Sequence, residues 1–362
     1  MGEWHPSIVK IEKGERHPNA DTLEVFTVLG DYPVISKENQ FKVGDLVGYL
    51  PIETIVPDID QFYFLCPNQY EKYEENGEVK QRAIGPKYPI GSVPEKNRRI
   101  KAKKLLGIYS QGLLIPAPHG MNEGDSLVEF LGLNKFEEEE EDNIQNPKVK
   151  GKNAEKAPVG WAIPYYDIEG LRKYVNQLME KEPIVLTEKL NGSNFSACFD
   201  GEKLWTKSRN FYKKEDPEDM WWDAALRMGL KEKLVQYPMK IFFGELIGQV
   251  KKFRYDAQIT DGKLLTKVCF FDVCDAKTGR YHDYDETVSM VTGLGLEMVP
   301  ELYKGPWLGN KEMYPYAEGK STLSDKCVRE GFVLRTLKER FEPKLQSRMI
   351  VKLIGQEYNL QK

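Results

Sequence analysis

A stretch with almost no apolar residues divides this chain of 362 residues in two. From Asn134 to Trp161 the sequence reads NKFEEEEEDNIQNPKVKGKNAEKAPVGW, an acidic run followed by Lys, Asn, Pro and Gly. Like charges repel and do not pack, so this stretch is typical of a linker or surface loop, with nucleic-acid mimicry or metal binding as the alternative. We therefore expect two domains, 1–134 and 161–362, joined by an acidic and polar linker at 135–160.

The overall composition narrows the class of protein. Hydrophobic residues make up 40%, enough for packed cores, and the formal net charge is -4, so any nucleic-acid-binding groove has to be a local basic patch. The five cysteines form no CxxC pair and the four histidines do not cluster with them, which argues against a zinc site and a disulfide framework. Without a signal peptide or a membrane-length apolar run, we expect a cytoplasmic or nuclear protein with no membrane association. Nothing in the sequence demands an oligomer, so we expect a monomer.

The N-terminal part is rich in short strand patterns. Brief β-branched and aromatic runs alternate with turn residues, which favours an OB-like β-barrel that binds nucleic acid across one face. HPNADTLEV resembles the strand-turn signature of OB-type tRNA-binding modules. Lys101, Lys103 and Lys104, with Arg98 and Arg99, form a local basic stretch, for RNA contact or for solubility. The predicted strands are SIVKIEKGERH, LEVFTVLG, YPVIS, DLVGYLP, RIKAKKLLGIYSQGLLIP and SLVEFLG.

The C-terminal part mixes helices with mostly antiparallel strands, so the fold class is α+β. NFSACFDGEKLWTKSRN reads as two strands about an Asp-Gly turn, a strong hairpin signal. DIEGLRKYVNQLMEK, PEDMWWDAALRMGLKEKLVQY and ETVSMVTGLG are the predicted helices. PIVLTEKL, KIFFGELIGQV, KVCFFDVCD, EGFVLRTL and MIVKLIG are the other predicted strands.

Charged residues interrupt five of these apolar strands. They are Lys189, Glu245, Asp272, Glu330 and Lys352. An unpaired buried charge is costly, so each has a partner or a function, and a salt bridge explains any one of them alone. Together, two cations and three carboxylates suit a phosphate-bearing substrate with a divalent metal.

The order of these segments is more specific than any one of them. EKLNG, SRN, FGEL, FFDV, EGFVLR and IVKL follow one another between Glu188 and Ile354. This order resembles the covalent nucleotidyltransferase superfamily of ATP-dependent RNA and DNA ligases and mRNA capping enzymes. Because the OB-like part comes first and about ten residues follow Lys352, the chain is most similar to the RNA ligase 5 family, which joins an N-terminal OB domain to a nucleotidyltransferase domain.

The resemblance implies the central chemistry. Lys189 would attack the α-phosphorus of ATP, with Lys352 near the α-phosphate and Mg²⁺ or Mn²⁺ as the metal. The nucleophile has to be neutral, so its pKa of about 10.4 in water has to be suppressed by cationic neighbours. Glu330, and less surely Glu245, would bind the metal through water.

The resemblance also implies roles around the nucleotide and the RNA. Glu188 would accept from the adenine amino group and repel guanine O6, favouring ATP over GTP. Phe271 would stack on adenine, with Phe270 as the alternate, since strand neighbours point to opposite faces. Glu245 would accept a hydrogen bond from a ribose hydroxyl, and Gly192 would allow a close approach of the backbone. Asn194 would orient the RNA-adenylate, and Arg209 would bind a phosphate or the 3'-OH end. Lys251, Lys252 and Arg254 would hold RNA backbone or be merely exposed, and Arg172, a weaker phosphate candidate, would be a solvated arginine.

Two positions depart from the family motifs. Asn191 stands where the family usually has Asp, so an oxygen remains but its charge is lost, and Ile354 stands where a second motif lysine is common. We expect Arg348, Lys344 or Arg335 to supply the missing cation, or one step to be slow.

We therefore expect an RNA ligase that seals 3'-OH and 5'-phosphate RNA ends, with nicked duplexes as its substrates. A nucleic-acid-binding protein with a weakened nucleotidyltransferase domain and a guanylyltransferase-like enzyme are the alternatives.

Overall fold

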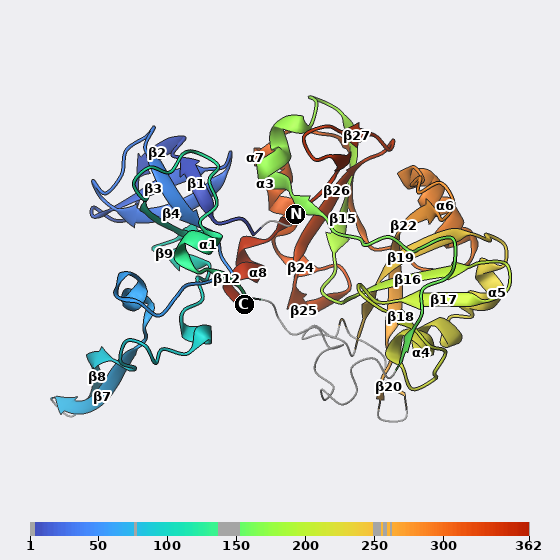
Figure 1. Ribbon diagram of the computed structural model, residues 1–362, viewed down its shortest axis with the longest axis horizontal. Coiled ribbons are helices and arrows are strands. Elements are labelled where there is room, and N and C mark those ends of the chain that lie inside the picture. The colour runs from blue at the N-terminus through green and yellow to red at the C-terminus, as the bar shows by residue number, and fades with distance from the viewer. Residues whose placement is uncertain are drawn as a thin grey trace. The chain divides into compact units, whose positions relative to one another are not determined.

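The computed structural model describes residues 4–75, 78–136, 153–248, 255, 259–260 and 263–361. By its internal contacts the chain divides into two units, residues 1–138 and 139–361, coloured from blue to green and from green to red in Figure 1. Most of the expected linker lies outside the described residues. Within the described residues, no helix combines the length and apolar character needed to cross a membrane.

The first unit is built from short antiparallel strands. Two three-stranded sheets, in the orders β1-β5-β11 and β2-β3-β4, enclose its apolar residues, among them Val9, Phe26 and Val34. Two-stranded ladders complete the unit. The elements are β1 Ser7–Lys10, β2 Lys13–Arg16, β3 Leu23–Val28, β4 Tyr32–Lys37, β5 Leu46–Leu50, β6 Thr54–Ile55, η1 Asp60–Leu65, β7 Asn68–Glu75, β8 Glu78–Pro86, η2 Glu95–Asn97, β9 Lys103–Leu105, β10 Ile108–Ser110, β11 Leu113–Pro116, α1 Val128–Leu131 and β12 Asn134–Lys135.

The HPNAD turn fastens two parts of the first unit together. The buried His17 ring lies with Nε2 3.0 Å from the Leu105 carbonyl oxygen, and its Nδ1 accepts a hydrogen bond from the Asn19 backbone N–H at 3.1 Å. Asn19 also donates to the Leu106 carbonyl at 2.9 Å. The turn before β3 therefore holds the β9–β10 hairpin in place.

The second unit contains two antiparallel sheets, visible side by side in Figure 1. One has six strands in the order β13-β18-β17-β16-β19-β22, and the other has five in the order β14-β29-β26-β15-β23, in which only β14–β29 is parallel. The strands are β13 Ala154–Glu155, β14 Glu169–Gly170, β15 Pro183–Lys189, β16 Ser193–Phe199, β17 Leu204–Lys207, β18 Tyr212–Lys213, β19 Lys240–Ile247, β20 Ile259–Thr260, β21 Lys263–Leu264, β22 Lys267–Asp275, β23 Glu301–Pro306, β24 Lys320–Ser321, β25 Ser324–Val328, β26 Gly331–Thr336, β27 Phe341–Glu342, β28 Ser347–Arg348 and β29 Ile350–Ile354. The helices are α3 Leu171–Tyr174, η3 Val175–Gln177, α4 Met220–Arg227, α5 Leu230–Leu234, α6 Tyr284–Gly293, α7 Asn310–Met313, η4 Tyr314–Ala317 and α8 Gln356–Gln361.

Helices cover one face of each sheet. On the six-stranded sheet, Phe195, Phe242 and Phe270 pack with residues of α4, α5 and α6. On the five-stranded sheet, Leu186 and Phe332 pack with residues of α3, α7 and η4. Because strand residues alternate between faces, the residues between these apolar ones point to the opposite face of each sheet.

The fold agrees with the predicted α+β class, with two local corrections. Val128–Leu131, predicted as a strand, is the helix α1, which ends at Gly132 with φ 63°. The predicted helix over residues 167–181 is reduced to α3 and η3, and its first residues pair instead with β29 as the strand β14. Short segments follow their tertiary neighbours more than their own periodicity.

Candidate active site

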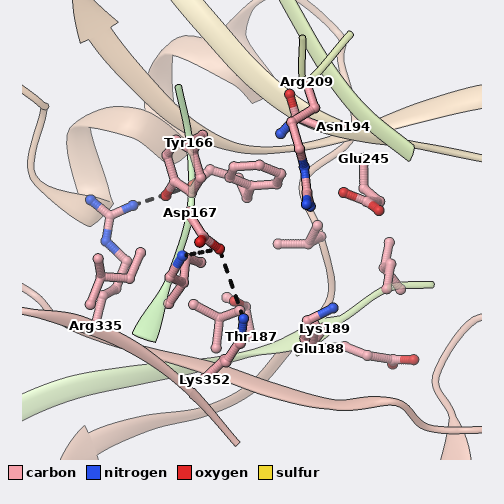
Figure 2. A pocket seen from close by; sticks show the side chains of 16 residues that line it. Tyr166, Asp167, Thr187, Glu188, Lys189, Asn194, Arg209, Glu245, Arg335 and Lys352 are labelled. Atoms are coloured by element: carbon pink, nitrogen blue, oxygen red, sulfur yellow. Dashed lines mark hydrogen bonds and ion pairs between the residues drawn. The ribbon is translucent and has the colours of Figure 1, made fainter. Parts of the chain in front are cut away.

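A pocket open to solvent lies in the second unit between the uncovered faces of its two sheets. Its empty volume, which includes space open to solvent, is about 830 Å³. Figure 2 shows Lys189, Glu245 and Arg209 on one side of it and Tyr166, Arg335 and Lys352 on the other. Seven of the predicted site residues line it, namely Glu188, Lys189, Asn194, Arg209, Glu245, Phe271 and Lys352.

The register of the five-stranded sheet explains why two lysines face the same pocket. Thr187 on β15, Val333 on β26 and Lys352 on β29 are direct neighbours across the three strands. Lys189 lies two residues after Thr187 and so points to the same face. All four residues line the pocket.

The six-stranded sheet supplies the opposite wall. Asn194 on β16 pairs directly with Glu245 on β19. Between β19 and β22 the register shifts, because Gly244 pairs with Phe270 and Phe243 with Asp272. Phe271 is thus the extra residue of a β-bulge, a feature that redirects a side chain.

The bulge decides between the two candidate aromatic residues. Phe271 lines the pocket, whereas Phe270 is fully buried and meets Phe195 and Phe242 edge to face at 6.2 Å. Gly244 permits this arrangement, because a Cβ there would lie 2.5 Å from Val268 Cγ1. Of these two phenylalanines, Phe271 is therefore the one available to a ligand.

Gly192 is needed for a close approach within the protein. An added Cβ would lie 2.3 Å from the Leu246 carbonyl oxygen and 2.8 Å from Glu245 Cγ. The Gly192 backbone N–H donates to Glu245 Oε1 at 3.0 Å. The glycine thus lets the loop after Lys189 lie against β19 and orient Glu245.

Lys189 is held by a carboxylate in the empty pocket. Its Nζ lies 2.6 Å from Glu330 Oε1, and its side chain is 25% exposed. Burial opposes the charged form, but Glu330 and Glu245 outweigh burial and raise the pKa of Lys189 above its ordinary value. Lys189 is therefore a cation before any ligand binds.

Glu245 has the opposite character. Burial, with the neighbouring Glu330 adding to it, raises the pKa of Glu245 to about 7, although Lys189 and Arg209 favour its charged form. Near neutral pH this carboxyl exchanges readily between its acid and its carboxylate. It is therefore responsive to any cation that enters the pocket.

The carboxylate of Glu188 already has partners. Ser321 Oγ donates to Oε1, the Thr322 backbone N–H donates to Oε2 at 2.8 Å, and Arg329 Nε lies 3.9 Å from Oε2. Glu188 thus anchors the β24–β25 turn as well as lining the pocket. Its expected contact with an adenine amino group stays a prediction.

Two cations at the pocket are placed by neighbouring groups. Lys352 Nζ lies 3.9 Å from Asp167 Oδ1, a residue outside the predicted motifs. Arg209 follows β17, and its carbonyl accepts a hydrogen bond from the buried Lys207 Nζ at 2.9 Å. Burial lowers the pKa of Lys207. Lys207 is thus well placed to fix the loop that presents Arg209.

Asn191 is the motif departure that the structure describes in most detail. Its backbone N–H donates to Tyr255 Oη at 2.6 Å, and its side-chain amide donates to Tyr358 Oη. Among the described residues, its Oδ1 is buried without a hydrogen-bond partner. The position therefore keeps an oxygen acceptor, although it lacks the charge of Asp.

The other departure, Ile354, lies in an apolar environment. Ile354 packs with Leu190 and Tyr358 in an apolar cluster. Arg335 and Arg348, expected as substitutes, are both ion-paired with Asp272, and Lys344 uses its backbone N–H to reach Glu342. Asp272, one of the five charged strand residues, is thus the buried partner of both arginines.

Arg172, expected to be solvated, is buried. It is 7% exposed, and its guanidinium carbon lies 4.7 Å above the Tyr314 ring. Lys251, Lys252 and Arg254 lie outside the described residues.

Sequence reasoning missed the segment that precedes the first motif. Tyr166, Asp167 and Ile168 line the pocket, although the motifs begin only at Glu188. The signal was the return of apolar and aromatic residues in WAIPYYDI at Trp161, after the polar stretch. Thr187 and Val333 follow from the alternation around Lys189 and Lys352.

The residues present fit a hard divalent cation bound through water. Glu245, Glu330 and the unpartnered Asn191 Oδ1 are oxygen acceptors of the kind Mg²⁺ and Mn²⁺ prefer. Within the described ranges, no group of three or more His, Cys, Asp or Glu side chains is arranged to hold a metal.

Comparison with known proteins relates the domain that contains this pocket to a known family. Residues 182–354, which contain every predicted motif, match the RNA ligase family model. This stretch of the second unit is similar to the RNA ligase family. Residues 6–85 match an OB-fold domain model, so the chain joins an OB-fold unit to the ligase domain. No sequence among the curated proteins matches the chain.

Solved structures share the fold across both units. A lysine-to-alanine mutant of Naegleria gruberi RNA ligase with ATP and Mn is similar with a TM-score of 0.73 and 21% identity, covering 98% of both chains. The same ligase with PPi gives 0.71 and 21% over 98% of this chain and 97% of that chain. An aspartate-to-alanine apo mutant gives 0.72 and 22% over 100% and 99%. The likeness shows that the OB fold followed by the ligase domain is a known architecture.

Proposed function

We propose that the protein is an ATP-dependent RNA ligase that joins a 3'-OH end to a 5'-phosphate end through a covalent lysyl-AMP. The observation that carries the proposal is the position of Lys189 beside Glu330 and Glu245, in a pocket that also presents Lys352, within an RNA ligase domain. Naegleria gruberi RNA ligase, which shares the fold, was solved with ATP and Mn, and this supports ATP and a divalent metal as ligands.

The reaction has three balanced steps. Lys189 Nζ forms a bond to the α-phosphorus of ATP, and the bond to pyrophosphate breaks. An oxygen of the RNA 5'-phosphate then attacks the same phosphorus, and the N–P bond breaks to give RNA-adenylate and free lysine. Finally the 3'-OH, losing its proton, attacks the RNA phosphorus, and AMP leaves. Lysine is suited to the first step because its amine is nucleophilic once neutral.

The first step requires Lys189 to lose the proton that Glu330 stabilises. Lys352 and Arg209 add positive charge on the sides of the pocket where a triphosphate would bind, and positive charge favours the neutral amine. A bound divalent metal would supply further charge neutralisation on the phosphate oxygens, with Glu330, Glu245 and Asn191 as the residues that would hold it through water. Loading of the pocket thus converts Lys189 from a cation to a nucleophile.

The pocket walls account for recognition of the nucleotide. Phe271 offers an aromatic face to the base, which gives affinity for any base. Glu188 retains lone pairs beside those used by Ser321 and Thr322, and a carboxylate favours the amino group of adenine over the O6 of guanine. We assign a ribose hydroxyl to Glu245 and the later RNA steps to Asn194 and Arg209.

The OB-fold unit is proposed to bind the RNA, most suitably a nicked duplex. Lys103 and Lys104 are exposed on the β9–β10 hairpin, with Lys104 Nζ 4.7 Å above the Tyr109 ring. Lysine and tyrosine side by side suit a phosphate and a base or sugar. We propose that the protein acts as a monomer inside the cell, in the cytoplasm or nucleus.

Transfer of label from nucleotide to protein tests the first step. The full chain is incubated with α-³²P-labelled ATP or GTP and Mg²⁺ or Mn²⁺ and then run on a denaturing gel. We expect label from ATP that is lost in Lys189→Ala and in Lys189→Arg, because neither side chain provides a neutral primary amine. A Lys203→Ala protein, altered at an exposed lysine on the same domain, should label normally.

The outcomes separate the candidate functions. No label from either nucleotide would contradict covalent catalysis and leave nucleic-acid binding, while label from GTP alone would identify a guanylyltransferase. If ATP labels the protein, a nicked duplex with RNA on the 3'-OH side should be sealed. A labelled protein that seals no RNA would overturn the ligase step.

A further inference from the structure

Tyr166 lines the ligase pocket from outside the family motifs. It lies in the segment between β13 and β14, ahead of Lys189 in sequence, and it lines the pocket (Figure 2). None of the three chemical steps uses its hydroxyl. Its contacts with the base-binding wall indicate another role.

The Tyr166 ring contacts the ring that would stack on the base. Its centroid lies 5.1 Å from that of Phe271 at an interplanar angle of 56°, and 4.9 Å from that of Phe243 at 44°. Tilted aromatic pairs of this kind prefer a defined mutual orientation. Since Phe271 occupies a bulge, the neighbouring ring has a large part in fixing its plane.

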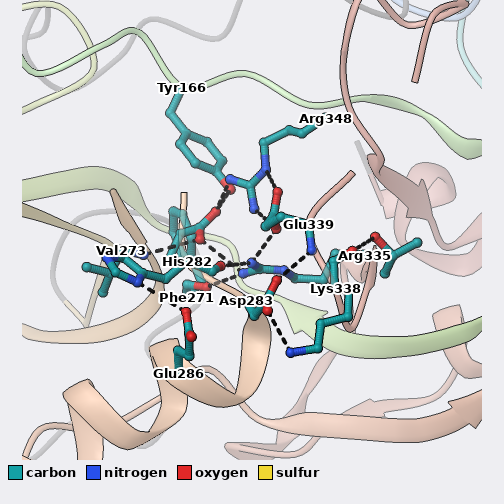
Figure 3. Close-up of polar contacts among 12 residues, drawn as sticks. Tyr166, Phe271, Val273, His282, Asp283, Glu286, Arg335, Lys338, Glu339 and Arg348 are labelled. Carbon is teal, nitrogen blue, oxygen red and sulfur yellow. Dashed lines mark hydrogen bonds and ion pairs between the residues drawn. The ribbon is translucent and has the colours of Figure 1, made fainter. Parts of the chain in front are cut away.

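The Tyr166 hydroxyl is fixed by a buried ion cluster, drawn in Figure 3. It donates to Asp272 Oδ2 at 2.7 Å. Asp272 is fully buried, and despite that burial the guanidiniums of Arg335 and Arg348 lower its pKa, so it is a charged acceptor. Burial, with Asp272 beside it, raises the pKa of Tyr166 well above its ordinary value, so the hydroxyl stays a donor.

The same cluster holds the backbone of Phe271. Arg335 Nη1 donates to the Phe271 carbonyl at 3.2 Å and to Asp272 Oδ1 at 3.0 Å. Glu339 accepts from Arg335 at 2.6 Å and from Arg348 Nε at 2.7 Å, so two carboxylates balance two guanidiniums. Arg335 belongs to the five-stranded sheet and Asp272 to the six-stranded sheet. The cluster thus joins the two pocket walls immediately behind Phe271.

We propose that Tyr166 is a positioning residue for the nucleotide base, acting through Phe271, whose ring it holds in the plane that stacks on the base. This inference rests on the proposed function for the identity of the nucleotide. Tyr166 is secured at its hydroxyl by Asp272 and at its ring by Phe243. Phe271 is secured at its carbonyl by Arg335 and at its ring by Tyr166. The base therefore meets a wall that is fixed before it binds, which spares the cost of ordering it.

Binding and catalysis together test this role. The Kd of ATP with Mg²⁺ is measured calorimetrically in the full chain carrying Lys189→Ala, which stops the covalent step. The ATP dependence of single-turnover lysyl-AMP formation is measured with Lys189 intact. Tyr166→Leu should weaken ATP binding by about three- to tenfold, the worth of an aromatic pair. The maximal rate should change little, since Tyr166 does not contact Lys189 in the described contacts.

Tyr237→Leu is the matched control. Tyr237 packs on Phe242 at 6.0 Å on the helix-covered face of the same six-stranded sheet, and it does not line the pocket. It should leave the ATP Kd unchanged even if it lowers the melting temperature. Tyr166→Phe, which keeps the ring and removes only the anchor, should weaken binding by about two- to threefold, the lower part of the range for one hydrogen bond.

A double-mutant cycle shows whether Tyr166 acts through Phe271. In a Phe271→Leu protein, Tyr166→Leu should weaken binding by less than it does alone. Fully additive losses, an unchanged Kd in Tyr166→Leu, or an equal loss in Tyr237→Leu would overturn the proposal. If the wild type binds ATP in a Tyr166-dependent way yet forms no lysyl-AMP, the ligase proposal fails and this one stands. If the wild type forms lysyl-AMP but binds ATP independently of Tyr166, the ligase proposal stands and the proposed role of Tyr166 fails.

Discussion

At the scale of single residues, the empty pocket keeps its two key groups in forms that differ from the reactive ones. Lys189 is a cation beside Glu330, and the pKa of Glu245 is raised to about 7. Both shifts arise from placing three ionisable groups close together with little water. Under the proposed function, a bound metal would relieve the repulsion between the two carboxylates.

The Glu245 carboxyl should make the stability of the empty protein depend on pH. Its folded-state pKa is raised from 4.5 to about 7, so the stability contributed by its protonated form is complete below pH 4.5 and is lost as the pH rises through 7. Glu245→Gln remains neutral throughout. We expect its free energy of unfolding, relative to that of the wild type, to rise by about 1–3 kcal/mol between pH 5 and pH 8. Denaturant unfolding without nucleotide or metal measures this difference.

Glu297→Gln provides the comparison for this measurement. Glu297 forms an exposed ion pair with Lys267, and exposed pairs contribute little to stability. The free energy of unfolding of this variant should equal that of the wild type at both pH 5 and pH 8. A Glu245→Gln advantage that is the same at pH 5 and pH 8 would show that Glu245 does not titrate in this range.

At the scale of secondary-structure elements, the site depends on strand alternation and on one bulge. Alternation was readable from the sequence, and it places Lys189, Thr187 and Lys352 on one face once the register is known. The bulge at Phe271 was not readable from the sequence. It depends on how β22 pairs with β19, which local sequence does not specify. For the same reason the sequence left Phe270 and Phe271 as alternatives.

Other elements show where sequence information ends. The Asp-Gly hairpin between β16 and β17 and the helix α6 were predicted from local signals that act within a few residues. α1 was predicted as a strand, and only α3 and η3 of the predicted helix over residues 167–181 are helical, because such short segments take the conformation that their neighbours stabilise. Tyr166 was missed because its contacts with Phe271 and Asp272 span more than a hundred residues of sequence.

The bulge predicts that two adjacent phenylalanines have separate roles. Phe271→Leu should weaken ATP binding by about 1–3 kcal/mol with little change in stability, since it loses a stacking face. Phe270→Leu should lower the free energy of unfolding by about 1–2 kcal/mol through poorer core packing, with the ATP Kd preserved. Calorimetric titration and thermal unfolding of both proteins distinguish the two effects. Equal effects on binding would mean that the bulge does not separate these residues in solution.

At the scale of the whole molecule, every residue that lines the pocket belongs to the second unit. That unit also has its own cores on the covered faces of its two sheets. The OB-fold unit has separate cores. Nucleotide chemistry and the proposed RNA binding are thus built into different parts of the chain.

This division predicts the behaviour of a fragment. Residues 139–362 alone should fold and form lysyl-AMP from ATP at a rate close to that of the full chain, while sealing a nicked duplex poorly. Label transfer and gel-based sealing assays measure the two activities, with Lys189→Ala in the fragment as the blank. A fragment that unfolds cooperatively yet takes no label would mean that the first unit completes the pocket.

The ion pair between Lys189 and Glu330 also affects how readily Lys189 reacts with other electrophiles. An ammonium group has no lone pair, so cyanate, aldehydes and acyl phosphates that diffuse into an unloaded pocket find nothing to react with. A lysine kept permanently neutral would be carbamylated or acylated over time, and each such event would destroy one enzyme molecule. Under the proposed function, Glu330 would thus slow the chemical modification of Lys189 while no nucleotide is bound.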